Sequence, residues 1–153
     1  MTKKEIISEI KEKKYFDIRE LVCKHTYDKF GEKAWQFFSC DYLHALLVIR
    51  KSILGKGMVC NNWHTGGSYS QRGLRCNCCD MIKEKKSIYL SAHCTGQGGD
   101  FTVMGMTAEE ARKKIKEYGN VLPVPVRLED GVNWLHMDTY SDETSVKVSL
   151  FKA

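Results

Sequence analysis

The sequence has few prolines and no long hydrophobic run. Only 2 of its 153 residues are proline, while 42% are hydrophobic and 28% are charged. This composition excludes a collagen-like, low-complexity or disordered chain. The best apolar run, Leu43 to Ile49, is interrupted by His44, so we expect no membrane span. The polar N-terminus lacks the apolar core of a signal peptide, and we therefore expect the protein to be made in the cytoplasm.

The chain also lacks a strong excess of charge of one sign. It carries 24 basic and 19 acidic residues, for a formal net charge of +5. This mild excess favours anionic partners, but it falls short of the clustered Lys and Arg residues of a nucleic-acid-binding face. We therefore expect no nucleic-acid partner. Ordinary solubility is the simpler explanation of the charge.

Seven cysteines are scattered along the chain, and their odd number argues against a disulfide framework. Cys76-Asn77-Cys78-Cys79 is the one cluster that suggests a metal site. Zinc knuckles usually come in pairs, and no second cluster is visible in the sequence. We therefore expect reduced, partly buried thiols. A metal or redox protein built on Cys76, Cys78 and Cys79 stays open as an alternative.

The order of helix and strand signals predicts an α+β fold in a single domain, 1–153. In residues 1–57, apolar residues at helical spacing follow two capping boxes, Thr2–Glu5 and Asp17–Glu20, and a further helix is predicted from Asp41 to Ile53. Residues 58–153 contain a helix behind the capping box Thr107–Glu110 and several short strand candidates. These strands are 58–63, 87–90, 101–103, 124–128, 132–140 and 145–151, the last two joined by a turn at 141–143. We expect the N-terminal helices to pack on a small, mainly antiparallel sheet.

His93 and Asp100 lie seven residues apart, a separation that suggests a metal site only if the chain turns between them. On a continuous helix they would be roughly 10 Å apart along the axis, too far for one ion. The intervening glycines allow a sharp turn, so we predict a strand that delivers His93, a glycine turn, and a second strand that opens at Asp100. His136 lies in an apolar strand, with Asp138 on the same face. From spacing alone, hydrogen-bonded strand histidines and a turn aspartate are the more common interpretation.

Taken together, these residues resemble a known family of zinc peptidases. The pattern is Ser91-x-His93-x-x-Gly96-x-Gly98-x-Asp100, followed by Trp134-x-His136. It resembles the S-x-H-x-x-G-x-A-x-D and W-x-H motifs of the zinc D-alanyl-D-alanine peptidases, which include VanX- and VanY-type enzymes and phage L-alanyl-D-glutamate endopeptidases. The segments 61–64 and 72–75 are similar to the family's region before the first ligand, so the resemblance covers about Met58 to Tyr140. Gly98 stands where the family has alanine, which keeps the residue small.

The resemblance implies a Zn²⁺ ion held by His93, Asp100 and His136, with water in the fourth position. Two imidazoles and one carboxylate are typical of a catalytic rather than a structural zinc site, because they leave one position open. The substrate that the resemblance implies is a peptidoglycan stem peptide.

The sequence departs from the family at the residue that exchanges the proton. Many members carry Glu three residues before the last ligand, where this chain has Asn133. Glu129, Asp138 and Asp130 remain as candidates for the general acid/base. Asp138 has a second possible role, because it shares a strand face with His136 and could orient that ligand.

Three more residues are candidates for binding the substrate. We predict that Arg75, or else Arg72, holds a substrate carboxylate or the oxyanion, because a guanidinium matches a carboxylate with two hydrogen bonds. A solvated loop arginine is the simpler alternative. Ser91 resembles the family serine and is expected to contact the substrate or to support His93. His64 is expected to be a loop histidine near the cleft.

The sequence thus predicts a zinc peptidase that cuts peptidoglycan stem peptides, as a monomer. A chain of this kind fits a phage or prophage lysis enzyme that reaches the cell wall through holes made by another protein, or a component of a phage particle. The main alternative is a zinc-binding module without catalysis, which Asn133 keeps open. The cysteine-based protein described above is the other.

Overall fold

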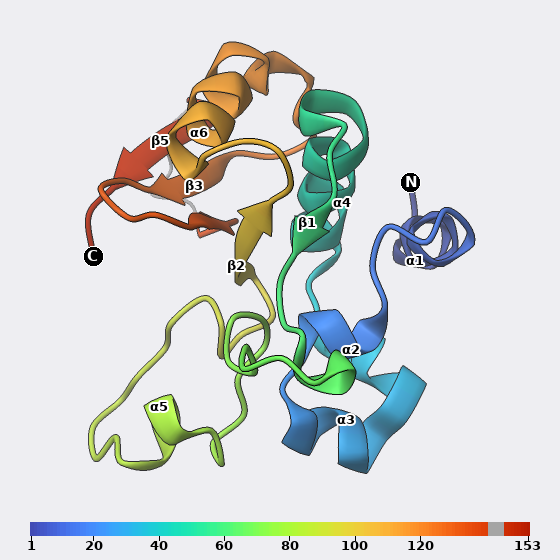
Figure 1. Ribbon diagram of the computed structural model, residues 1–153, viewed down its shortest axis with the longest axis vertical. Helices are drawn as coiled ribbons and strands as arrows, with labels where there is room; N and C mark the ends of the chain where they lie inside the picture. Colours follow the sequence, from blue (N-terminus) through green and yellow to red (C-terminus); the bar gives the residue numbers. More distant parts are fainter. Residues whose placement is uncertain (141–145) are drawn as a thin grey trace.

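The N-terminal part is helical, and three of the helices begin where the sequence predicts them. The computed structural model describes residues 1–140 and 146–153 (Figure 1). The predicted capping boxes at Thr2, Asp17 and Thr107 are all formed. The helices are α1 (Lys3–Glu12), α2 (Ile18–Leu21), α3 (Lys24–Phe30), the 3₁₀ helix η1 (Gly31–Phe37), α4 (Cys40–Val48), the π-helical turn η2 (Ile49–Leu54), the 3₁₀ turn η3 (Trp63–Thr65), α5 (Asp80–Lys83), α6 (Ala108–Glu117) and the 3₁₀ turn η4 (Gly119–Val121).

Helix α4 and the turn η2 continue one another and form the central helix of the molecule. The residues predicted to face inward are all buried: Leu43, Leu46, Leu47, Ile49 and Ile53. The run ends at Gly55, which has φ +60° and closes it in the left-handed conformation that glycine tolerates. Helix α1 packs against α4 through Ile6 and Ile10, so the apolar stripes of the sequence form the core.

The second part of the chain forms a sheet of five strands. They are β1 (Met58–Val59), β2 (Gly98–Val103), β3 (Val126–Glu129), β4 (Leu135–Asp138) and β5 (Val148–Phe151), arranged in the order β1-β2-β4-β3-β5. Neighbours pair antiparallel except β3 and β5, which are parallel. The α+β architecture with a small sheet is therefore confirmed. Helix α6 lies over the sheet and contacts β2 and β4 (Figure 1).

Each central strand turns one face to the core and the other to the candidate site. In β4, Leu135 and Met137 lie in the core and alternate with His136 and Asp138. In β3, Val126 and Leu128 lie in the core and alternate with Arg127 and Glu129. Side chains alternate between the two faces along a strand, so the polar residues of both strands share one face.

Three of the strand predictions are wrong in detail. Residues 87–90 lie in an exposed loop, where the side chain of Ile88 is 90% exposed. His93 comes from a turn, and Asp100 is the third residue of β2 because the strand already begins at Gly98. Strand β1 is limited to Met58–Val59, because the chain enters the turn η3 soon afterwards.

The last two strands do not lie side by side. Strand β5 pairs with β3, while β4 lies between β2 and β3. The predicted turn at 141–143 lies outside the described residues. None of the helices in the described ranges combines the length and the apolar character that a membrane crossing requires.

Candidate functional site

The three predicted metal ligands meet on the polar face of the sheet. Candidate ligand atoms of His93, Asp100 and His136 all lie within 4.8 Å of one another. Asp100 in β2 pairs directly with His136 in β4, which places their side chains side by side. His93 reaches them from the turn before β2. Gly96, in this turn, has φ +69°, and a Cβ there would lie 2.0 Å from the carbonyl oxygen of Phe37. The position therefore requires glycine.

Both histidines are held by hydrogen bonds on the side away from Asp100. His93 donates from Nδ1 to the carbonyl oxygen of Gly73 at 2.9 Å, and its Nε2 lies 3.3 Å from Oδ2 of Asp100. His136 has Nδ1 2.7 Å from Oδ1 of Asp100 and donates from Nε2 to Oδ2 of Asp138 at 2.8 Å. Outer hydrogen bonds of this kind fix the tautomer and the orientation of histidines that ligate metals.

The protonation states in the metal-free protein follow from this close packing. Burial alone would raise the pKa of Asp100, but the hydrogen bonds from His136 and His93 hold it well below its ordinary value. Burial would lower the pKa of His136, but its hydrogen bonds to Asp100 and Asp138 raise it to about 9. The cluster therefore contains a carboxylate and an imidazolium at neutral pH. A cation bound at Nδ1 would replace the proton that His136 shares with Asp100.

The donor set fits a bound metal ion. Two imidazole nitrogens and one carboxylate converge, and a fourth position is needed to complete a tetrahedron. A hollow of about 460 Å³ is lined by all three side chains. In the described residues, then, the predicted ligands form a group able to hold a metal ion.

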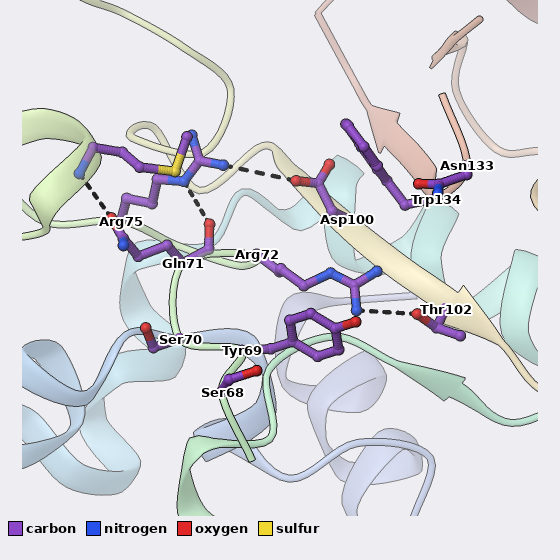
Figure 2. A pocket seen from close by; sticks show the side chains of 11 residues that line it. Ser68, Tyr69, Ser70, Gln71, Arg72, Arg75, Asp100, Thr102, Asn133 and Trp134 are labelled. Atoms are coloured by element: carbon purple, nitrogen blue, oxygen red, sulfur yellow. Dashed lines mark hydrogen bonds and ion pairs between the residues drawn. The ribbon is translucent and has the colours of Figure 1, made fainter. Parts of the chain in front are cut away.

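Arg75 is not the solvated loop residue of the alternative interpretation. Its side chain is buried, and Nη2 lies 3.7 Å from Oδ2 of Asp100. Nε donates to the carbonyl oxygen of Gln71. Figure 2 shows the guanidinium facing Asp100, with Trp134 on the other side of that carboxylate. Arg75 therefore places a positive charge at the edge of the candidate metal site.

A second hollow, of about 470 Å³, continues from the metal group past Arg75 and Asp100 (Figure 2). Arg72 lines it, stacks over the ring of Tyr69 at 4.3 Å and donates to Oγ1 of Thr102 at 3.1 Å. Asn133 lines the same hollow, beside Trp134. Ser91 instead lines the first hollow, with its Oγ 3.8 Å from Sγ of Cys94. Arg75 and Asp100 border both hollows, which together form one cleft across the site.

Glu129 lies at the end of β3, on the strand face that carries Arg127. The register of β3 with β4 joins Arg127 to Asp138 and Leu128 to Met137, and Glu129 is the next residue of β3. Glu129 and the three candidate ligands line the same hollow. Its carbonyl oxygen accepts a hydrogen bond from Nη1 of Arg112, which anchors the backbone from the helix α6.

Both carboxylate oxygens of Asp138 accept hydrogen bonds. Arg127 donates to them from Nε and Nη2, each at 2.9 Å, and the backbone N–H of Tyr140 donates to Oδ1 at 3.1 Å. His136 donates to Oδ2, as described above. Burial alone would raise the pKa of Asp138, but the hydrogen bonds from His136 and Arg127 keep it below its ordinary value. This environment suits a carboxylate that orients His136.

Two of the remaining sequence candidates lie away from the metal group. Asp130 follows β3 at the turn, where its N–H donates to the carbonyl oxygen of Phe151. The ring of His64 packs on Trp63 with its centroid 5.6 Å away, and burial lowers its pKa. His64 is not among the residues that line the two hollows at the metal group; it lies in η3, which contacts α2, near Asp17 and Arg19.

Gly98 has a structural role that the comparison with alanine did not suggest. A Cβ at this position would lie 2.7 Å from Cβ of Ala92 and 3.1 Å from Cβ of Asp138. The backbone of β2 therefore approaches both the turn that carries His93 and the residue that holds His136. A larger residue would separate them.

Sequence reasoning found only half of a second group of side chains. Cys23, His25, Cys76 and Cys79 bring their ligand atoms within 4.8 Å of one another, so they too form a group able to hold a metal ion. The expectation that no second cluster of ligands pairs with the Cys76–Cys79 segment is wrong. Its partner is the short C-x-H pair at Cys23 and His25, and Cys78 stays outside the group. The signal was present in the sequence, but the two segments are 51 residues apart.

No family model, curated protein or solved structure matches this chain. The resemblance to zinc peptidases therefore depends on the motif residues themselves and on the way the fold assembles them.

Proposed function

We propose that this protein is a zinc-dependent peptidase that hydrolyses a peptide bond in peptidoglycan stem peptides. The observation that carries the proposal is the convergence of His93, Asp100 and His136 in the lining of one hollow. In that arrangement, two imidazoles and a carboxylate would bind Zn²⁺ and leave a position for water. Bound zinc would lower the pKa of that water and polarise the scissile carbonyl.

Glu129 would act as the general acid/base. Its place in β3 and in the lining of the hollow that the three candidate ligands also line supports this role. In this role it takes the proton from the attacking water and delivers it to the leaving amine. Asn133 has an amide side chain that cannot perform this transfer.

Arg75 and Asp138 would have different tasks. Arg75 faces the cleft at the edge of the metal group and would bind the carbonyl oxygen of the scissile bond or a carboxylate of the stem peptide. Arg72 and Ser91 would contact the substrate from the two sides of the cleft. Asp138 would act as a positioning residue, because its oxygens already accept hydrogen bonds from His136 and Arg127.

The cellular setting forms part of the proposal. We propose that the protein acts on the cell wall as a phage or prophage enzyme, either after release through holes made by another protein or as part of a phage particle. The net charge of +5 favours weak attraction to anionic wall polymers.

Digestion of purified peptidoglycan tests this function. The zinc-loaded protein is incubated with insoluble peptidoglycan, and the soluble fragments are identified by mass spectrometry. We expect fragments cut within or at the end of the stem peptide, and no such fragments with zinc-loaded Glu129→Gln. Zinc-loaded protein that leaves the stems intact would favour the alternative of a binding module without catalysis.

A further inference from the structure

Four side chains outside the candidate active site are arranged as the ligands of a second metal. Cys23 and His25 come from the start of α3, while Cys76 and Cys79 come from the loop before α5. All four ligand atoms lie within 4.8 Å of one another. Sγ of Cys76 is 3.6 Å from Nδ1 of His25 and 3.9 Å from Sγ of Cys79, which in turn is 3.9 Å from Nδ1 of His25.

These distances match the edges of a tetrahedron around zinc. With Zn–S of about 2.3 Å and Zn–N of about 2.0–2.1 Å, a regular tetrahedron has edges of roughly 3.8 Å between two sulfurs and roughly 3.5 Å between sulfur and nitrogen. The sulfur–sulfur distance between Cys76 and Cys79 and both distances to His25 agree with these values within about 0.4 Å. Three cysteines and one histidine form a set that closes all four positions, as structural zinc sites do.

The local backbone supports the same interpretation. Cys76 and Cys79 form the C-x₂-C knuckle, in which the N–H of Cys79 donates to the carbonyl oxygen of Cys76 at 3.2 Å. The N–H of Cys78 donates to Sγ of Cys76 at 3.4 Å, a contact that stabilises a thiolate. Cys23 and Cys79 are 1% exposed, whereas Cys78 is exposed and lies outside the group.

The two ligand pairs are joined by a short parallel bridge between Val22 and Leu74. The N–H of Leu74 donates to the carbonyl oxygen of Leu21 at 2.8 Å, and the N–H of Cys23 donates to that of Leu74 at 3.0 Å. A Cβ on Gly73 would lie 2.2 Å from the carbonyl oxygen of Leu21, so glycine is needed for this close approach. The fold therefore positions both pairs by backbone contacts that are independent of a metal.

We propose that Cys23, His25, Cys76 and Cys79 bind a structural Zn²⁺ that ties the 72–76 segment to the helical part. This segment is hydrogen-bonded to the candidate active site: the backbone carbonyl oxygen of Arg72 accepts a hydrogen bond from the N–H of Asp100 at 2.7 Å, and the carbonyl oxygen of Gly73 accepts one from Nδ1 of His93. The N–H of Arg75 donates to the carbonyl oxygen of His93 at 3.0 Å. The proposal stands without the peptidase function, because it depends only on these four ligands.

Cobalt substitution tests the proposal on the whole protein. Cobalt bound by thiolates gives a strong ligand-to-metal absorption in the near ultraviolet, and a site of two histidines and one aspartate has no sulfur to produce it. We expect this absorption in the wild-type protein after reduction, metal removal and titration with Co²⁺, and we expect Zn²⁺ to displace it. Absence of the thiolate absorption in the reduced wild-type protein would overturn the proposal without any variant having to fold.

Matched variants identify the ligands. Cys76→Ser and Cys79→Ser should lose the thiolate absorption or weaken it with altered bands, and their zinc content should fall by one per chain. Cys78→Ser, in the same loop, should keep both. His93→Ala should retain the thiolate absorption, because it alters only the other group. Wild-type absorption and zinc content in both Cys76→Ser and Cys79→Ser would show that these sulfurs are not ligands.

Discussion

At the scale of single residues, the metal group is the part of the site that the sequence predicts best. The residues His93, Asp100 and His136 carry the motif, and all three meet in the structure. The identity of the proton carrier could not be read in the same way, since Glu129, Asp130 and Asp138 are all carboxylates close in sequence. The structure distinguishes their surroundings: Glu129 and Asp138 line the same hollow, but the oxygens of Asp138 accept hydrogen bonds from Arg127 and His136, and Asp130 is not among the lining residues.

The carboxylate at Glu129 is expected to be required for turnover and not for metal binding. Glu129→Gln keeps the size and hydrogen bonding of the side chain but cannot carry the proton. We expect a loss of kcat of about a hundred- to ten-thousand-fold, with the zinc content unchanged. Asp130→Asn is the matched control and should retain activity. A zinc-loaded Glu129→Gln enzyme with normal kcat would remove Glu129 from this role.

Asp138 is expected to affect catalysis through His136. Asp138→Asn leaves Arg127 and His136 with a poorer acceptor, so we expect about a 10- to 100-fold loss in metal affinity or activity. The distinguishing measurement is a zinc titration: activity should recover when the variant is saturated with zinc. If the saturated variant stays inactive while Glu129→Gln is active, the two roles are the reverse of those assigned.

Arg75 is expected to need its guanidinium group. An ammonium at this position keeps the charge but cannot donate two parallel hydrogen bonds to one group. We predict that Arg75→Lys lowers kcat/KM, with a loss of about 2–4 kcal/mol in transition-state stabilisation. Zinc content must be measured alongside, because Arg75 lies next to Asp100. Arg50→Lys, in the helical part, serves as the control. Unchanged kcat/KM in Arg75→Lys would leave Arg75 without a role in substrate binding.

At the scale of elements, local signals are predictable and distant pairings are not. The capping boxes at Thr2, Asp17 and Thr107 involve residues only three apart, and all three form as predicted. The parallel pairing of β5 with β3 depends on the whole sheet, and a hairpin with β4 was the simpler expectation from the sequence. The same difficulty concealed the group of Cys23, His25, Cys76 and Cys79, whose two halves meet only in the folded chain.

The close contact between Gly73 and Leu21 gives a test at this scale. Gly73→Ala would place a Cβ 2.2 Å from a backbone oxygen, which cannot move aside as a side chain would. We expect a loss of about 1–3 kcal/mol in the free energy of unfolding, because the Val22–Leu74 bridge must open. Gly57→Ala is the control, since its Cβ would meet only the flexible side chain of Met104 at 3.1 Å. Equal unfolding free energies for the two variants, measured by urea titration, would argue against a close contact between Gly73 and Leu21.

At the scale of the whole molecule, the helical part and the sheet share one core. Residues from α1, α4, α6 and the central strands belong to a single buried cluster. The candidate active site lies on the opposite face of that sheet, and the 72–76 segment connects it to the helices. Metal binding is therefore expected to influence the stability of the entire chain.

Thermal unfolding with and without zinc measures this influence. A ligand that binds only the folded state at one hundred times its Kd adds about 2.7 kcal/mol of stability. For a chain of this length, that corresponds to a rise in Tm of about 5–10 °C for one bound ion. Magnesium at the same concentration is the control, because it avoids sulfur and nitrogen ligands. The same Tm in zinc, in magnesium and after chelation would contradict metal binding by the folded protein.

The masses of the fragments released from peptidoglycan are the sharpest test of the proposal that this protein cuts stem peptides with His93, Asp100 and His136 as the residues that would hold a zinc ion. Wild-type protein, Glu129→Gln and His136→Ala are each given zinc, assayed for metal content and incubated with the same purified peptidoglycan. We predict stem-peptide cleavage by the wild type, none by His136→Ala, which has lost the ion from this site, and very little by Glu129→Gln, which has kept it. Intact stems with fully zinc-loaded wild-type protein, or cleavage at the wild-type rate by His136→Ala, would contradict it.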